Sequence, residues 1–180
     1  MKKNVTLEEY IGKGGYSKLR ETYIKVLEGE LELRDPNPPR TLVSMALNPA
    51  YSTWYWTVAA LVTLTIAVIP LTEAISVLKY ARYMLGSLYV LLLPGYVTVE
   101  ALYPEERSLK PLERLALSIG LSLAIVPLIG LILNYTPAGI RLWPVAIAIA
   151  LYTLTTATIA LYRKYKIHMI TLEAREHTPS

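Results

Sequence analysis

Long stretches without a charged residue are the feature that most limits what this chain can fold into. Four such windows occur in the 180 residues, and they hold 32, 17, 26 and 21 residues. A helix needs about 20 apolar residues to cross a hydrocarbon core of about 30 Å. A buried helix of a soluble protein explains one run of about 10–14 residues, but not four longer ones. The charge-free windows are residues 41–72, 83–99, 115–140 and 142–162.

These windows predict an all-α membrane protein with four transmembrane helices. The first window is longer than one crossing requires, and its first part contains Asn48 followed by Pro49. We therefore expect an interfacial linker at residues 41–52, before the transmembrane domain. The second window is short, and Tyr83 and Tyr103 extend it to the two interfaces. The predicted spans are about residues 53–72, 83–103, 112–135 and 142–163, within a four-helix domain of residues 53–163.

Lys and Arg are distributed unevenly about the four spans, which predicts the orientation. Four crossings place both termini and the middle loop on the same side of the membrane. That side carries fifteen of the eighteen Lys and Arg residues, and the other side carries three. Cytoplasmic segments are enriched in these residues. We therefore expect a multi-pass protein of the cell (plasma) membrane with both termini cytoplasmic, and a cytoplasmic tail at residues 164–180.

Residues 1–40 predict a small cytoplasmic helical module. Thr6 and Glu9 have the spacing of a capping box that opens a short helix. Glycines follow, and Ser17 caps a second helix over residues 18–28. This order is also that of a DNA-binding helix-turn-helix, but the net charge before the first span is only about +1. Binding to DNA phosphates requires a strongly positive surface. We therefore expect a docking module, and we do not expect nucleic acid as a partner.

Small residues recur at helical spacing in spans three and four. Such residues let two helices approach closely within a membrane. In span three they stand four apart, and in span four they alternate at intervals of four and three, which favours a left-handed contact. We expect these two spans to pack together along the two lines. Alternatively, one line is the face of a homo-oligomer or of a contact with another membrane protein. The residues are Ala116, Gly120 and Ala124 in span three, and Ala146, Ala150, Thr153, Ala157 and Ala160 in span four.

Proline and glycine inside the spans predict helix breaks. Pro94 and Gly95 are adjacent in span two, and Pro127 lies in span three. Proline removes one helical hydrogen bond and kinks or breaks the helix. Such a break either fits the helices together or lines a cavity. We favour the packing role, and we expect any cavity to lie at Pro94-Gly95.

Ionisable side chains in the spans are confined to the span ends. A charge at the centre of a membrane helix costs roughly 2.5–3.5 kcal/mol, whereas a side chain at the end reaches the interface. We expect ion pairs there, with a proton-carrying site as the alternative. The expected pairs are Glu73 with Lys79 or Arg82, and Glu100 with Arg107 or Arg114.

The residue types that carry most catalysis and metal binding are scarce. The chain has no Cys and one Asp, and both of its His residues lie in the last thirteen positions. Thiol catalysis, disulfides and Fe–S ligation are therefore excluded. Glu173 and His177 stand one helical turn apart, but a solvated polar tail is a poor metal site. We predict no enzymatic activity, no cofactor and no metal.

Three sequence blocks together resemble an archaeal integral-membrane family. They are residues 91–96 (LLLPGY), 113–122 (ERLALSIGLS) and 133–141 (LNYTPAGIR). The family is known only as domain of unknown function sixteen-sixteen, and the similarity covers about residues 53–163. The resemblance implies a four-helix membrane domain in an archaeon, and it supplies no activity and no catalytic residues. The absence of Cys and Gln also fits a thermophile, in which thermolabile residues are depleted.

The favoured function is therefore that of a non-enzymatic structural or accessory subunit of a membrane assembly. Its expected partners are the lipid bilayer and either other membrane proteins or further copies of the chain. One alternative is a small transporter or lipid-handling protein that uses the break at Pro94-Gly95. The other is a membrane-tethered regulator with a cytoplasmic helix-turn-helix.

Overall fold

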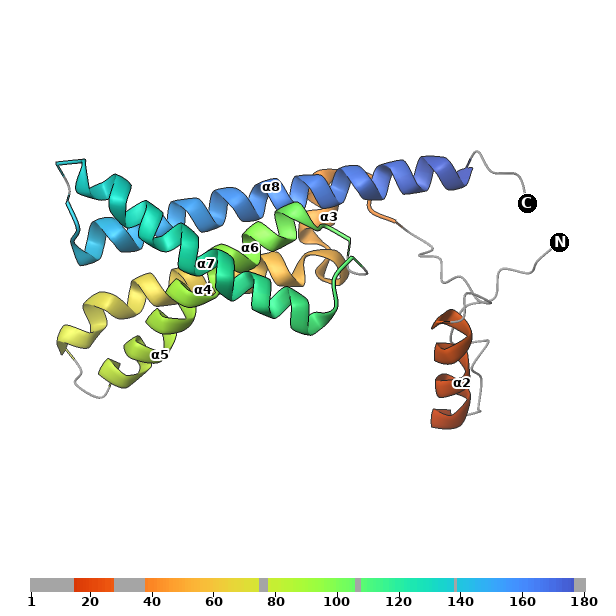
Figure 1. Cartoon of the computed structure of the whole chain (residues 1–180). Coiled ribbons are helices and arrows are strands. Elements are labelled where there is room, and N and C mark those ends of the chain that lie inside the picture. Colours follow the sequence, from red (N-terminus) through yellow and green to blue (C-terminus); the bar gives the residue numbers. More distant parts are fainter. Residues whose placement is uncertain (1–14, 28–37, 75–77, 106–107, 138, 177–180) are drawn as a thin grey trace. The chain divides into compact units, whose positions relative to one another are not determined.

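The structure is a computed structural model that describes residues 15–27, 38–74, 78–105, 108–137 and 139–176 (Figure 1). The chain divides into two compact units, Met1–Pro38 and Pro39–Ser180, and each is treated by itself. All regular secondary structure in the described residues is helical, in agreement with the predicted all-α class.

Helix α2 (Gly15–Leu27) lies in the first unit. It begins three residues before the helix predicted there, so Gly15 belongs to the helix and not to the preceding turn. Lys25 Nζ lies 2.7 Å from Glu21 Oε1, one helical turn away. The hydrogen bond from Lys25 lowers the pKa of the Glu21 carboxyl below its ordinary value. The first helix predicted for this module, which Thr6 opens, lies outside the described residues.

A helical corner occupies residues 41–52, where the sequence predicts an interfacial linker. Helix α3 (Leu42–Leu47) ends at Asn48, and helix α4 (Pro49–Ala74) begins at the next residue. The Asn48 side-chain oxygen accepts the Ala50 N–H at 3.1 Å and so caps α4. Proline is favoured at the first helical position. The α4 helix therefore begins four residues before the predicted span.

The second predicted span consists of two helices. Helices α5 (Leu78–Leu91) and α6 (Leu93–Leu102) meet at Leu92, whose backbone angles of φ −122° and ψ −47° are not helical. Pro94 in the first turn of α6 has no N–H, and its ring interferes with the carbonyl four residues earlier. The break therefore lies two residues before the predicted Pro94-Gly95, because proline disturbs the turn that precedes it.

Helices α7 (Pro111–Asn134) and α8 (Leu142–Glu176) follow as an antiparallel hairpin. Gly139 in the connecting turn has φ +64°, a left-handed conformation that glycine adopts without strain. Pro127 lies inside α7, which stays one continuous helix, so the break predicted at Pro127 is absent. Helices within membrane proteins tolerate the loss of a single hydrogen bond when the flanking turns continue.

Helix α8 continues well past the last apolar window. Its 35 residues correspond to about 52 Å, compared with a hydrocarbon core of about 30 Å. Residues 164–176 contain no Gly or Pro, so no strong helix breaker stops it there. This extension packs on the α3–α4 corner: Tyr165 Oη donates to the Arg40 carbonyl at 3.1 Å. The His168 ring meets the Tyr51 ring edge-on, with centroids 5.3 Å apart.

Helix α6 lies at the centre of the second unit, against α7 and α8, while α4 packs against α5 and α8 (Figure 1). The buried apolar core joins α4, α5, α6 and α8, and α7 contacts its edge through Val126 and Ile129. Its buried members are Val58, Val62, Tyr89, Leu93, Val97, Ile149, Ala150 and Ala157.

Within the residues that the structure describes, four helical segments are long and apolar enough to cross a membrane, which is the number that the charge-free windows predict. The second of them covers α5 from Arg82 onward and all of α6. The third, α7, is the most apolar of the four and also the least buried within the chain. The segments are Pro49–Thr72, Arg82–Leu102, Pro111–Asn134 and Leu142–Ala174.

Candidate functional site

Three buried charged side chains meet near the C-terminal end of α6. Arg114 Nη1, from the first turn of α7, lies 2.5 Å from Glu100 Oε1. Lys164 Nζ, from α8, lies 2.6 Å from Glu100 Oε2. The Glu100 side chain is 5% exposed, and those of Arg114 and Lys164 are 16% and 13% exposed. We refer to Glu100, Arg114 and Lys164 as the charge cluster, and it ties α6, α7 and α8 together at one end.

A fourth helix joins the charge cluster through an aromatic ring. Lys164 Nζ lies 4.5 Å from the centroid of the Trp54 ring on α4. An ammonium group over an indole face is attracted by the negative potential of the ring. The Trp54 Nε1 atom is itself buried, and it has no hydrogen-bond partner among the described residues. The cluster therefore connects all four apolar segments and leaves a buried donor beside Lys164.

Two arginines also bind backbone carbonyls around the end of α6. Arg114 Nη2 approaches the carbonyls of Tyr103 and Glu105 at 3.4 and 3.3 Å. Arg163 Nη1 donates to the Ala101 carbonyl at 2.5 Å. Carbonyls in the last turn of a helix lack intrahelical partners, and a guanidinium offers several donors in one plane. These contacts fix the C-terminal end of α6 and the start of its connection to α7.

Closer to the middle of the helices, α6 crosses α7 at unusually short range. A Cβ atom on Gly95 would lie 1.8 Å from the Ser118 carbonyl oxygen, so only glycine fits there. The Gly95 N–H donates to Ser122 Oγ at 2.8 Å. Ser118 and Ser122 are both buried. Pro94-Gly95 therefore serves the packing of α6 on α7, the role that the sequence analysis favours.

The small residues of α8 and α7 have opposite environments. All five predicted packing residues of α8 are buried. Helix α8 packs against α6 and α4 as well as against α7. Ala116, Gly120 and Ala124 of α7 are exposed, and a Cβ on Gly120 meets no atom within 4 Å. The predicted contact of these three residues with α8 is therefore not made. Two neighbouring small residues of α7, Ser118 and Ser122, face α6 instead. Ser122 also accepts the hydrogen bond from the Gly95 N–H. The buried α8 residues are Ala146, Ala150, Thr153, Ala157 and Ala160.

Of the expected ion pairs, the structure brings Glu100 and Arg114 together. Arg82 Nη1 donates to Thr72 Oγ1 at 3.2 Å. The Glu73 side chain and all of Arg107 lie outside what the structure describes. Sequence reasoning missed Lys164 as a second partner of Glu100. Lys164 lies in the row of basic residues just after the last apolar window, and the sequence does not distinguish it from Arg163 or Lys166.

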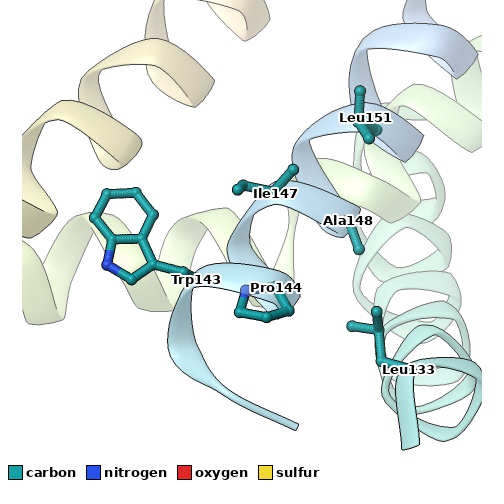
Figure 2. Close-up of a pocket in the computed structure, with 6 residues that line it drawn as sticks. All are labelled: Leu133, Trp143, Pro144, Ile147, Ala148 and Leu151. Atoms are coloured by element: carbon teal, nitrogen blue, oxygen red, sulfur yellow. The ribbon is translucent and has the colours of Figure 1, made fainter. Parts of the chain in front are cut away.

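Two of the hollows on the described surface of the second unit are apolar and open. One of about 390 Å³ lies between α7 and α8, with Leu133 facing Pro144 and Ala148 (Figure 2). The other, of about 560 Å³, lies between α5 and α7 beside the helix break. Leu91 and Leu92 line it, whereas Pro94 and Gly95 are buried, and Gly95 lies against α7. Within the described residues, no three His, Cys, Asp or Glu side chains are placed to share a metal ion.

Comparison with known proteins identifies a family but no characterised relative. A family model described as Domain of unknown function (DUF8471) matches residues 58–172, which is more than half of the chain. No curated protein and no solved structure matches. A domain of unknown function is what the sequence resemblance implies, whereas the particular archaeal family named for that resemblance is not confirmed. On the strength of this match, the chain belongs to the DUF8471 family.

Proposed function

We propose that this chain is a multi-pass integral membrane protein that acts as a non-enzymatic structural or accessory subunit of a membrane assembly. The observation that carries the proposal is the set of four apolar helices whose buried charges gather at one end. Charged side chains in membrane proteins face the protein interior and pair with one another near the interface. The Lys and Arg distribution supports a cytoplasmic position for that end, for both termini and for the α6–α7 connection. The membrane in question is the cell membrane.

Extraction from membranes tests the insertion itself. The expressed full-length chain is expected to stay in the membrane pellet at alkaline pH and to require detergent for release. Release by alkaline carbonate alone would contradict insertion.

The exposed face of α7 supports the role as a subunit. This helix is the most apolar of the four and the least buried, and Ala116, Gly120 and Ala124 form a shallow line on its surface. Small residues of this spacing let a second membrane helix approach closely. The scarcity of catalytic residue types in the sequence supports a non-enzymatic role. The partner is another membrane protein or a second copy of the chain.

Cysteine cross-linking in native membranes tests this contact, because the natural chain contains no Cys. Gly120→Cys and Ala124→Cys are expected to form a defined disulfide or thiol cross-link with a neighbouring helix. Leu151→Cys and Ile159→Cys, on the exposed face of α8, are the matched controls. Equal cross-linking at both faces would contradict a specific α7 contact. Recovery of a lone monomer from mild detergent under all conditions would contradict the subunit role as a whole.

A lipid-handling protein is the second candidate function, and the groove between α5 and α7 favours it. This groove of about 560 Å³ is lined almost wholly by apolar side chains and lies beside the helix break. An acyl chain matches such a lining. Transfer of labelled lipid between vesicles that contain the purified chain would favour this candidate, and an absence of transfer would leave the subunit role.

The membrane-tethered regulator is the third candidate. Binding of the full chain to DNA that weakens steeply with salt would support it. The archaeal and thermophilic source also stays a prediction, which rests on the resemblance and on the absence of Cys and Gln.

A further inference from the structure

We propose that the end of the unit carrying the charge cluster binds the phosphate of an anionic lipid headgroup, with Arg163 as its exposed contact. This inference rests on the proposed membrane insertion, which places that end at the level of the lipid phosphates. Its basis is an excess of positive charge around one buried carboxylate, together with a buried donor that has no acceptor among the described residues.

The charge cluster is unbalanced. One carboxylate, Glu100, contacts two cations, Arg114 and Lys164, at 2.5 and 2.6 Å. The three side chains together therefore carry one net positive charge. All three are at least four-fifths buried, so water and salt screen that charge less than at a free surface. An anion at the edge of the cluster would balance it.

Arg163 adds a second net charge at the edge of this cluster. It directly precedes Lys164, and its Nη1 atom is held 2.5 Å from the Ala101 carbonyl, one residue after Glu100 in the sequence. The Arg163 residue is exposed, so its remaining donors are accessible. A guanidinium with one nitrogen fixed and others open is suited to bind a phosphate group through paired hydrogen bonds.

Trp54 supplies an independent indication that an acceptor is missing. Its Nε1 donor is buried and has no partner among the described residues, although buried donors are nearly always paired. The Lys164 ammonium stands over the same ring. Tyr103 and Tyr162, both exposed, lie at the same end of the helices, as interfacial tyrosines do. Basic pockets between membrane helices on the cytoplasmic side bind anionic lipid headgroups.

Native mass spectrometry of the full-length chain tests the proposal. The protein is released from mixed micelles that hold equal amounts of phosphatidylglycerol and phosphatidylcholine, and the retained lipids are counted. The natural chain is expected to retain phosphatidylglycerol preferentially. Arg163→Gln is expected to lower that preference by roughly five-fold, the effect of one cation near a lipid surface. Arg163→Lys keeps the charge and should keep most of the preference.

The matched control is Arg141→Gln, which removes an exposed arginine next to the opposite end of α8 and should leave the preference unchanged. An unchanged melting temperature of each variant in detergent establishes that it is folded. Equal retention of the two lipids by the natural chain, or an unaltered preference in Arg163→Gln, would overturn the proposal. Complete displacement of phosphatidylglycerol by an equal concentration of inorganic phosphate would overturn the assignment to a lipid. Because alkaline extraction is measured separately, a chain that is membrane-integral but shows no lipid preference refutes this inference alone.

Discussion

At the scale of single residues, Gly95 is the position at which the α6–α7 contact is most demanding. Gly95→Ala would place a methyl group 1.8 Å from the Ser118 carbonyl oxygen, which is backbone and cannot rotate away. The two helices would have to separate, and overpacking of this kind costs about 1–3 kcal/mol. We expect a lower free energy of unfolding for Gly95→Ala, measured by denaturant titration in detergent micelles.

Gly120→Ala provides the control, since a Cβ at Gly120 meets no atom within 4 Å. Alanine is favoured over glycine inside a helix by roughly 0.5–1 kcal/mol. This variant should therefore be as stable as the natural chain or slightly more stable. Equal destabilisation by the two substitutions would show that α6 and α7 do not cross at Gly95.

Glu100 is the second residue whose replacement has a defined consequence. Glu100→Gln keeps the size of the side chain but leaves Arg114 and Lys164 buried without a compensating charge. Removal of one partner from a buried ion pair typically costs about 3–5 kcal/mol. We expect a loss of this order in the free energy of unfolding, measured in the same micelles. Glu105→Gln, on the exposed α6–α7 connection, should be neutral, and similar stability of both variants would contradict a stabilising cluster.

The charge cluster also shows how far single residues can be predicted from the sequence. Glu100 and Arg114 stand out because they are charges at span ends, and the structure brings them together. Lys164 does not stand out, because it comes 64 positions after Glu100 and belongs to a row of basic residues. The choice among Arg163, Lys164 and Lys166 depends on the rotation of α8 about its axis. Hydropathy carries no information about that rotation when all faces of the helix are apolar.

At the scale of helices, the two lines of small residues differ in what surrounds them. Ala157 on α8 is fully buried, whereas Ala124 on α7 is exposed. Ala157→Leu should therefore overpack the core and lower the free energy of unfolding by about 1–3 kcal/mol. Ala124→Leu should change the stability of the isolated chain by no more than about 0.5 kcal/mol. Thermal unfolding in detergent distinguishes the two, and a reversed order would mean that the Ala124 face of α7, rather than the Ala157 face of α8, is buried within the chain.

The sequence predicts the presence of the apolar helices better than it predicts the residues at which they begin and end. Charge-free windows locate four apolar segments because the cost of a charge inside a bilayer is large. The ends follow other rules. Pro49 at the first helical position starts α4 early, and α8 runs on to Glu176 because no breaker stops it. Likewise, Pro94 interrupts a helix and Pro127 does not, since the outcome depends on whether neighbouring helices accept the freed backbone groups.

At the scale of the whole molecule, the second unit has two chemically different ends. Near the α6–α7 connection lie the charge cluster, Arg163 and the extension of α8. Near the α7–α8 turn, Arg141 is the charged residue that the chain supplies. Lys and Arg near the ends of membrane spans resist transfer across the membrane, so the end that carries more of them stays in the cytoplasm. The difference between the two ends therefore leads to a prediction for the topology.

Single cysteines introduced into this Cys-free chain test the topology in intact cells. Lys79→Cys and Thr136→Cys should react from outside with a maleimide that does not cross membranes. Ser108→Cys and Thr171→Cys should react only after the cells are permeabilised. All four positions are exposed, so differences in labelling report the side of the membrane rather than burial. A complete inversion of the pattern would retain four crossings but reverse the orientation, and would place the charge cluster outside. If Ser108→Cys and Thr171→Cys instead label on opposite sides, α7 and α8 do not both cross, and the four-span architecture is wrong.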